Sequence, residues 1–317
     1  MLFRSKQIFG NIILFCAAII WGFAFVAQVV SLESGLGPVS FNAIRFAVGA
    51  LALIPVILIF DRKNDKQNPQ KLIIGSLVSG FFLFAAANLQ QYALSINANP
   101  GFAGFITALY TVWTPILYFL IFKKNTSLNV WIAVVVSIIG FYLLCMTSGG
   151  GISFGLDVAL LLISTLFWAA QILSLDYFVA GVSALKLSLG EYFVCSALSF
   201  AYALIFEREG LTLAAIGDAK WSILYCGILS VGVAYTLQVV GQKMTSPVLA
   251  VIIMSTESVF SAIGGVLWNL IVPVSLHINQ DISLVGYIGC AVIFVGVIIS
   301  QVDFSAIINR MRARNNS

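Results

Sequence analysis

Charged side chains are scarce in this sequence. Only 9% of the 317 residues are Asp, Glu, Lys or Arg, and 61% are hydrophobic, whereas about 25% of the residues are charged in an ordinary soluble domain. A water-facing surface cannot be built from so few charges. The composition therefore excludes a soluble globular protein and predicts a protein whose surface lies largely in a lipid bilayer.

The chain also lacks the residue patterns of common catalytic and metal sites. The one histidine, His277, has no HExxH or GxSxG motif around it, and the five cysteines fall within apolar runs with no CxxC spacing. Asp157 and Asp176 lie about 28 Å apart on one predicted helix, so they cannot share a proton. We therefore predict no catalytic residues, no enzyme activity, no metal and no cofactor, and we expect the cysteines to be small core residues.

Long apolar runs are what the sequence has in abundance. Each is about 20 residues long, which is enough for a helix to cross roughly 30 Å of hydrocarbon. The first run is longer than the core of a signal peptide, so we interpret it as a helix. We expect ten transmembrane helices, at residues 8–30, 38–60, 72–94, 101–121, 128–147, 157–179, 184–206, 220–240, 247–270 and 282–301.

Basic residues are distributed unevenly between the two ends of these helices. If successive helices alternate in direction, 13 Lys and Arg residues fall on the side of the N-terminus and two fall on the opposite side. The positive-inside rule then predicts a multi-pass protein of the cell membrane, plasma or inner, with both termini in the cytoplasm. Because topology accounts for the positive charge, we expect the lipid bilayer and no nucleic acid as a partner.

The two halves of the chain resemble each other at an offset of about 147 residues. Trp21 corresponds to Trp168, and Pro100 corresponds to Pro247. We expect one five-helix repeat at residues 8–147 and a second at 154–301. Because five is odd, the second repeat enters the membrane from the opposite side, an architecture typical of secondary transporters. The predicted fold class is an all-α membrane protein of ten transmembrane helices in two inverted repeats.

Three ionisable residues, Arg45, Glu191 and Glu257, fall inside predicted helices. Each lies at helical spacing from small residues, which mark helix contacts or a cavity wall rather than a lipid-facing surface. The topology puts Arg45 in the outer third, Glu257 near the midplane and Glu191 near the inner side, so we expect no direct Arg45–Glu191 salt bridge. Two interpretations stay open. The charges either anchor helices to one another, or they line a substrate site, with Glu257 as a proton acceptor or cation contact.

Neutral polar and aromatic residues near these charges suit a polar small molecule. Gln171 lies near mid-depth with Trp168 one turn earlier, and Tyr110 corresponds to Glu257 at the repeat offset. Aromatic residues at helical spacing also serve packing alone. The candidate residues of a substrate-binding cavity are Arg45, Asn42, Gln90, Tyr110, Trp168, Gln171, Glu191 and Glu257.

Three segments carry a family resemblance: AIIWGFAFVA at 18–27, FNAIRFAVGAL at 41–51 and PVLAVIIMSTESVFSAIGGVL at 247–267. Through them the sequence resembles the drug/metabolite transporter superfamily in its ten-helix form with two EamA-type repeats. The resemblance covers residues 8–301. It implies that helices one to four and six to nine surround a central cavity, with helices five and ten at the side. The chain departs from the family at Glu191, where members commonly carry a neutral amide.

The resemblance and the repeat architecture together predict a secondary transporter. We expect it to export a small metabolite, an amino acid or a related polar or amphipathic compound, by alternating access. The intramembrane carboxylates permit proton coupling, and the protein is expected to be a monomer or a homodimer. The alternative is a non-transporting membrane sensor or assembly subunit that retains the duplicated fold. Short loops favour the transporter.

Overall fold

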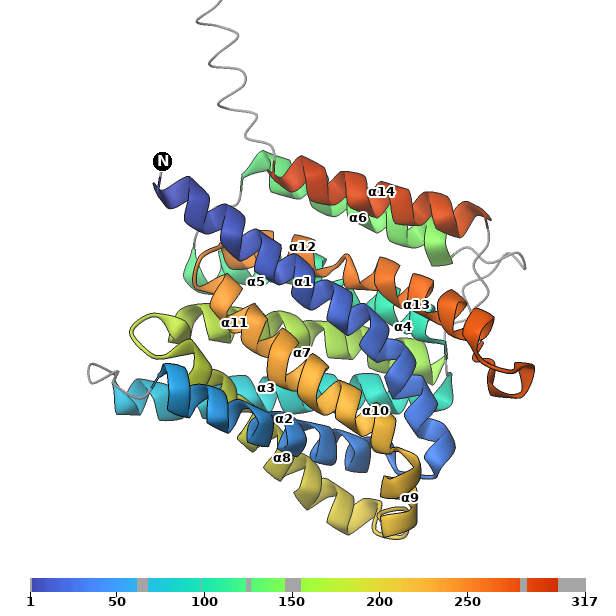
Figure 1. Ribbon diagram of the computed structural model, residues 1–317. Helices are drawn as coiled ribbons and strands as arrows, with labels where there is room; N and C mark the ends of the chain where they lie inside the picture. The colour runs from blue at the N-terminus through green and yellow to red at the C-terminus, as the bar shows by residue number, and fades with distance from the viewer. Residues whose placement is uncertain are drawn as a thin grey trace, which may run out of the picture.

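The computed structural model describes residues 2–61, 68–97, 99–123, 127–145, 155–279 and 284–301. Within these ranges the chain is helical and contains no strand (Figure 1). Eight segments of the described chain are long and apolar enough to cross a membrane, and two shorter apolar helices accompany them. The molecule is therefore a multi-pass membrane protein. The eight segments are Lys6–Ser34, Pro38–Phe60, Pro69–Ile96, Pro100–Phe122, Leu156–Val179, Ala184–Phe206, Lys220–Gln242 and Pro247–Ile271.

Most helix bounds agree with the apolar runs of the sequence. The runs at 38–60 and 184–206 coincide with α2 (Pro38–Phe60) and α8 (Ala184–Phe206). Other helices extend a few residues beyond their runs: α1 (Leu2–Ser31), α3 (Pro69–Ile96) and α7 (Leu156–Val179). Three short elements complete the description: η1 (Leu32–Ser34), at the end of the first span, and α9 (Leu213–Asp218) and η3 (Val274–Leu276), outside the spans.

Several helices begin with a proline that follows a capping side chain. Asn68, Asn99 and Ser246 each accept a hydrogen bond from the backbone amide three residues later, and a proline occupies the next position in all three. Proline suits the first helical position because that position needs no amide donor, and the capping oxygen satisfies one of the free amides of the first turn. These local signals fix where the helices start.

Two of the predicted helices are each broken into two parts. The run at 101–121 forms α4 (Pro100–Thr107) and α5 (Tyr110–Phe122), and the run at 247–270 forms α12 (Pro247–Met254) and α13 (Glu257–Ile271). The breaks lie at the same place in the two halves, because residues 108–109 and 255–256 differ by the repeat offset. Broken helices at a central site are a recurring feature of secondary transporters.

The second break is a tightened turn whose backbone groups remain satisfied. The amide of Thr256 donates to the carbonyl of Ile253 at 3.2 Å. This acceptor lies three residues earlier in the chain, whereas in an α-helix it would lie four residues earlier. The carbonyl of Ile252, which would otherwise accept from that amide, accepts from the hydroxyl of Ser255 at 2.8 Å. Hydroxyl side chains therefore take over backbone hydrogen bonds at a place where lipid offers none.

The span Lys220–Gln242 contains a π-helix at its centre. It consists of α10 (Lys220–Leu224), the π-helix η2 (Tyr225–Tyr235) and α11 (Thr236–Gln242). π-helical turns are frequent at functional sites. η2 packs closely on α2 at Gly49, where an added Cβ atom would lie 2.3 Å from Cγ1 of Val231. A glycine is therefore required at this contact.

Helices α6 (Leu128–Cys145) and α14 (Leu284–Gln301) lie side by side at one edge of the bundle (Figure 1). The contact is nearly symmetric. Gly140 of α6 lies against Gly289 and Ile293 of α14, and Gly296 of α14 lies against Ala133 and Ser137 of α6. This arrangement agrees with the expectation that the fifth and tenth helices stand at the side of the bundle.

Two carboxylates connect the ends of α2 and α8, and we call them the carboxylate clips. Glu207, just after α8, accepts hydrogen bonds from the backbone amides of Val39 and Ser40 at the start of α2. Asp61, just after α2, accepts a hydrogen bond from Ser183, the N-cap of α8. The two clips hold opposite ends of the α2–α8 pair together. Glu207 satisfies free amides at the start of α2, and Asp61 binds the hydroxyl that caps α8.

The cysteines do not all lie in the core. Cys195 and Cys226 are buried, as expected, but Cys16 is exposed on the outside of the bundle. The expectation was wrong for Cys16, because an apolar run does not indicate which face of its helix points inward and the lipid-facing side accepts a small apolar residue equally well. Cys145 and Cys290 belong to residues whose side chains lie outside the described part.

Candidate functional site: a central cavity between the two halves

A cavity lies at the centre of the bundle, where both halves of the chain contribute side chains. Its walls enclose about 440 Å³ of space, including the part that opens outward. The enclosed centre has room for about two water molecules. The lining residues are Trp21, Ala24, Phe25, Gln28, Arg45, Gln90, Thr107, Tyr110, Trp168, Ile172, Ser230, Tyr235, Gln238, Met254 and Glu257.

Three aromatic rings form one wall of the cavity. Tyr235, at the end of the π-helix, lies 4.7 Å from the ring of Trp21 and 6.0 Å from the ring of Trp168. Each indole also donates a hydrogen bond: Trp21 to the carbonyl of Ser230 at 3.3 Å, and Trp168 to Oε1 of Gln90 at 2.9 Å. The two tryptophans occupy equivalent positions in the two halves of the chain, and both contact the ring of Tyr235.

Arg45 enters the cavity with its guanidinium only partly engaged. Its Nε donates to Oδ1 of Asn42 at 2.7 Å, and its charge lies 5.0 Å from the centre of the Phe46 ring. No carboxylate pairs with Arg45 in the described residues. Besides Asn42, the guanidinium faces the thiol of Cys226, a weak hydrogen-bond acceptor. The side chain is 2% exposed. Arg45 is thus a buried cation beside the cavity, with no anionic partner in the described chain.

Asn42 fixes the position of Arg45 through a network that joins three helices. Nδ2 of Asn42 donates to the carbonyl of Ala87 and to Oδ1 of Asn88 on α3. Nδ2 of Asn88 in turn donates to the hydroxyl of Ser199 on α8 at 2.9 Å. The guanidinium is therefore held in one orientation from its Nε side, and no carboxylate of the described chain engages its terminal nitrogens.

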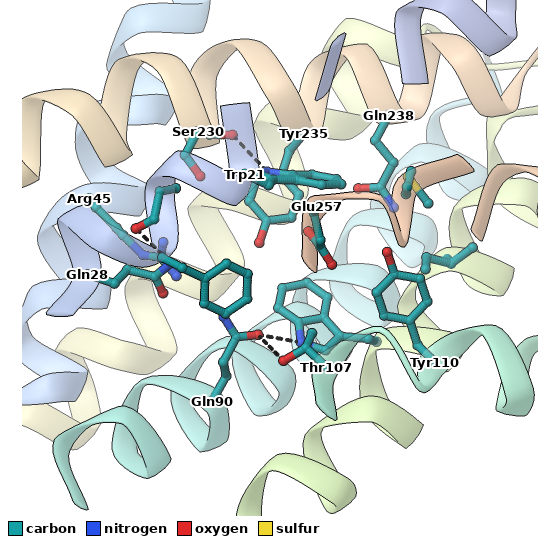
Figure 2. Close-up of a pocket in the computed structure, with 15 residues that line it drawn as sticks. Trp21, Gln28, Arg45, Gln90, Thr107, Tyr110, Ser230, Tyr235, Gln238 and Glu257 are labelled. Carbon is teal, nitrogen blue, oxygen red and sulfur yellow. Dashed lines mark hydrogen bonds between the residues drawn. The ribbon is translucent and has the colours of Figure 1, made fainter. Parts of the chain in front are cut away.

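Glu257 and Tyr110 open the second parts of the two broken helices. They occupy equivalent positions, as the first residues of α13 and α5. Glu257 is 5% exposed and has no cationic partner among the described residues. The Tyr110 hydroxyl faces the Glu257 carboxylate (Figure 2). A helix N-terminus favours the carboxylate at this place.

Two glutamine oxygens in the cavity wall also lack partners. Oε1 of Gln28 and Oε1 of Gln238 are buried and accept no hydrogen bond within the described residues. Figure 2 shows Gln28 beside Arg45 and Gln238 near Tyr110, at the two ends of the view. A buried acceptor without a donor is costly, so these atoms indicate where water or a ligand completes the site.

The residues that the sequence nominated divide into two groups. Arg45, Gln90, Tyr110, Trp168 and Glu257 line the cavity. Asn42, Gln171 and Glu191 are buried but do not line it; each touches a lining residue directly or through one further side chain. Accordingly α8, the seventh of the expected helices, supplies no lining residue, although the family resemblance places that helix around the cavity.

Sequence reasoning missed several lining residues, above all Tyr235, Gln28 and Gln238. Gln238 could have been found, because its neighbour Leu237 and Gln238 itself repeat the Leu89–Gln90 pair near the same offset. Tyr235 carries no such signal, since its orientation depends on the π-helix. Trp21 was named from the sequence only as the counterpart of Trp168. Since Trp168 was a candidate cavity residue, this correspondence could also have predicted Trp21 as one.

The site has no grouping suited to a metal ion. Across the ranges that the structure describes, no three His, Cys, Asp or Glu side chains lie together. The chemistry available is recognition: one cation, one carboxylate, amide groups and aromatic faces around a small enclosed space.

Comparison with known proteins agrees with this architecture. The sequence pattern of the EamA-like transporter family matches residues 8–146 and 156–301. An uncharacterized transporter from Archaeoglobus fulgidus is 27% identical over 300 residues, which cover 93% of this chain and 86% of that protein. A protein of known crystal structure shares the fold, with a TM-score of 0.70 at 17% sequence identity over 92% of this chain and 96% of the other. Because the family pattern matches both halves and covers most of the chain, the protein belongs to the EamA-like transporter family and is a membrane transporter.

Proposed function

We propose that the protein is a secondary transporter of a small zwitterionic metabolite, an α-amino acid or a close relative, that works by alternating access. The observation that carries this proposal is the pair of unpaired opposite charges in one cavity. Arg45 and Glu257 both line it, and neither has an ionic partner in the described chain. A carboxylate would meet the terminal nitrogens of Arg45, and an ammonium group would meet Glu257.

The rest of the cavity suits the remainder of such a molecule. Phe25, Ile172 and Met254 present apolar surface, and the rings of Trp21, Trp168 and Tyr235 add aromatic faces. The unpaired oxygens of Gln28 and Gln238 add acceptors at the two ends. Ligand sites commonly combine mostly apolar walls with a few placed polar groups.

The small free space at the centre supports alternating access. Room for about two water molecules is too little for an amino acid, so the cavity must widen before a ligand enters. In our proposal the membrane is crossed ten times, with α6 and α14 as the fifth and tenth spans. Two inverted repeats, at residues 8–147 and 154–301, then rock against each other. We propose that the protein lies in the cell membrane with both termini in the cytoplasm and acts in export, the direction that the family resemblance favours.

A binding screen followed by a transport assay tests this function. Purified protein is heated with each of the L-amino acids, and binders are identified by a raised unfolding temperature, because a ligand that binds only the folded state stabilises it. Binders are then tested for counterflow in proteoliposomes, in both orientations of the gradient. We expect at least one apolar L-amino acid to bind, and its methyl ester and its N-acetyl derivative, each lacking one charge, to bind much more weakly.

Matched variants separate recognition from folding. Glu257→Gln should abolish the preference for the free ammonium group, while Glu209→Gln, a change at an exposed position, should leave binding unchanged. The proposal fails if no amino acid binds, or if the ester and acetyl derivatives bind as well as the parent compound.

A further inference from the structure

Two glutamines form a hydrogen-bonded chain from the cavity to a second buried carboxyl group, Glu191. Gln238, in the cavity wall, donates from Nε2 to Oε1 of Gln171 at 3.1 Å. Gln171 donates from Nε2 to Oε2 of Glu191, also at 3.1 Å. None of the three side chains is more than 1% exposed. The chain therefore connects the cavity with a carboxyl group that does not itself line the cavity.

Glu191 is incompletely satisfied at its far side. Its Oε1 has no hydrogen-bond partner in the described residues, and neither has the hydroxyl of Ser188 one turn earlier. No Lys, Arg or His of the described chain forms an ion pair with it. A fully buried carboxylate with only neutral neighbours and no cation is costly in its ionised form, so binding a proton relieves this site.

The surroundings of Glu191 offer few other ionisable groups. The helices α3, α7 and α11 present only hydroxyls and amides to it: Ser79, Gln171, Gln238 and Thr236. The ionisable groups of the neighbourhood are Tyr192 and Cys195 on α8 itself, Arg45 from α2 and Tyr235 from η2. Within this neighbourhood Glu191 is the one carboxyl group.

The two amides point in the same direction, and this direction depends on the charge of Glu191. In the structure both donate toward Glu191, which leaves the oxygen of Gln238 at the cavity without a partner. An ionised carboxylate only accepts hydrogen bonds and therefore favours this order. A protonated Glu191 donates instead, to Oε1 of Gln171. Both amides then turn over, and Nε2 of Gln238 faces the cavity in place of the oxygen.

We propose that Glu191 is a proton-binding site that controls, through Gln171 and Gln238, whether the cavity presents an acceptor or a donor at its Gln238 end. One proton from water adds to one carboxylate oxygen, and no other bond is made or broken. With Glu191 ionised, the cavity accepts an ammonium group; with Glu191 protonated, the Gln238 amide repels it. The role in exchange rests on the proposed transport function, but the proton site can be tested without any substrate.

The first experiment needs no ligand. Infrared difference spectra of the full-length protein in lipid nanodiscs are recorded on lowering the pH, and the carbonyl band of a protonated carboxyl group is followed. We expect Glu191→Gln to remove one component of this band. Glu257→Gln should leave that component in place, and Gln171→Leu should shift its frequency because the protonated carboxyl group loses its hydrogen bond to Gln171. An unchanged band in Glu191→Gln overturns the proposal, as does the loss of the same component in Glu257→Gln.

The second experiment tests the coupling with L-leucine as the probe. In the wild type, L-leucine affinity should fall with falling pH by up to tenfold per pH unit, the limit for one linked proton. Gln238→Leu should flatten this profile while keeping the Glu191 band, which a purely structural role of Gln238 would not do. A profile that stays as steep in Gln238→Leu and in Glu191→Gln overturns the coupling. If neither L-leucine nor any other amino acid binds the wild type or the variants, but the carboxyl band of Glu191 changes with pH, the proposed function is refuted and the proton-binding site is supported.

Discussion

The carboxylate clip at Glu207 provides a stringent test of how the helices are held together. Its two oxygens accept from the amide of Val39 at 3.1 Å, the amide of Ser40 at 2.7 Å and the hydroxyl of Ser40 at 2.8 Å. The first amides of a helix have no partner within it, so Glu207 caps α2 from the end of another helix. Glu207→Ala removes the acceptor for all three donors.

The size of the effect follows from the number and exposure of these hydrogen bonds. A hydrogen bond to a charged group contributes about 1.5–3 kcal/mol, and three would sum to about 5–9 kcal/mol if none could be replaced. The donors are only partly buried, so water replaces much of this. Loss of an ordinary helix cap costs about 0.5–2 kcal/mol. We expect Glu207→Ala to lower the free energy of unfolding by about 2–3 kcal/mol, and Ser40→Ala, which removes one donor, by about 1 kcal/mol.

Thermal unfolding of the purified variants in one detergent tests whether Glu207→Ala is destabilised more than Ser40→Ala. Glu209→Ala is the matched control, because Glu209 is exposed and forms no hydrogen bond or ion pair in the described part of the chain. Its unfolding should stay within about 0.5 kcal/mol of the wild type. If Glu207→Ala and Glu209→Ala unfold at the same temperature, the clip contributes nothing to stability and the argument from helix capping is refuted.

Three further substitutions probe the cavity and the packing around it. Arg45→Lys should weaken binding of an amino acid about tenfold or more, measured by calorimetry, since a single ammonium cannot replace the planar fork. Gly49→Ala should lower the unfolding temperature strongly, because its Cβ atom would lie 2.3 Å from Val231. Trp168→Phe should cost about 1 kcal/mol of stability through the lost hydrogen bond to Gln90, read from thermal unfolding.

Each of these substitutions has a control in the same chain. Gly217→Ala adds a Cβ atom where no atom lies within 4 Å, so it should be neutral or stabilising. Trp221→Phe changes a side chain that is 73% exposed and should have little effect. For Arg45, normal expression and an unchanged unfolding temperature would show that the loss concerns the ligand. Equal effects of the two glycine substitutions would contradict the close packing of α2 on η2.

The helix positions could be predicted from the sequence because each depends on local composition. Apolar length, an asparagine or serine cap and a following proline are all readable along the chain, as at Asn68 and Ser246. The breaks in the fourth and ninth spans could not be predicted in this way. Neither Ala108–Leu109 nor Ser255–Thr256 contains glycine or proline, and all four residues keep right-handed helical backbone angles with a slightly tightened turn.

The cavity was predicted in part. Residues that interrupt an apolar run with charge, such as Arg45 and Glu257, are conspicuous in the sequence, and both line the cavity. Glu191 is equally conspicuous but lies behind the wall, because the direction in which a side chain points depends on how the helices are rotated. Tyr235 escaped notice because the π-helix that sets its direction has no known sequence pattern.

The two helix breaks have a consequence for how a ligand is held. They occupy equivalent positions of the two halves, yet Tyr110 follows one and Glu257 follows the other. Equal residues at the two places would offer a ligand two poses of equal energy, related by the pseudo-two-fold axis. An uncharged phenol opposite a carboxylate removes this degeneracy. In the alternating-access cycle that we propose, the ligand then keeps a single orientation whichever side of the membrane the cavity faces: the transporter is pseudo-symmetric about the bilayer, and the bound ligand is not.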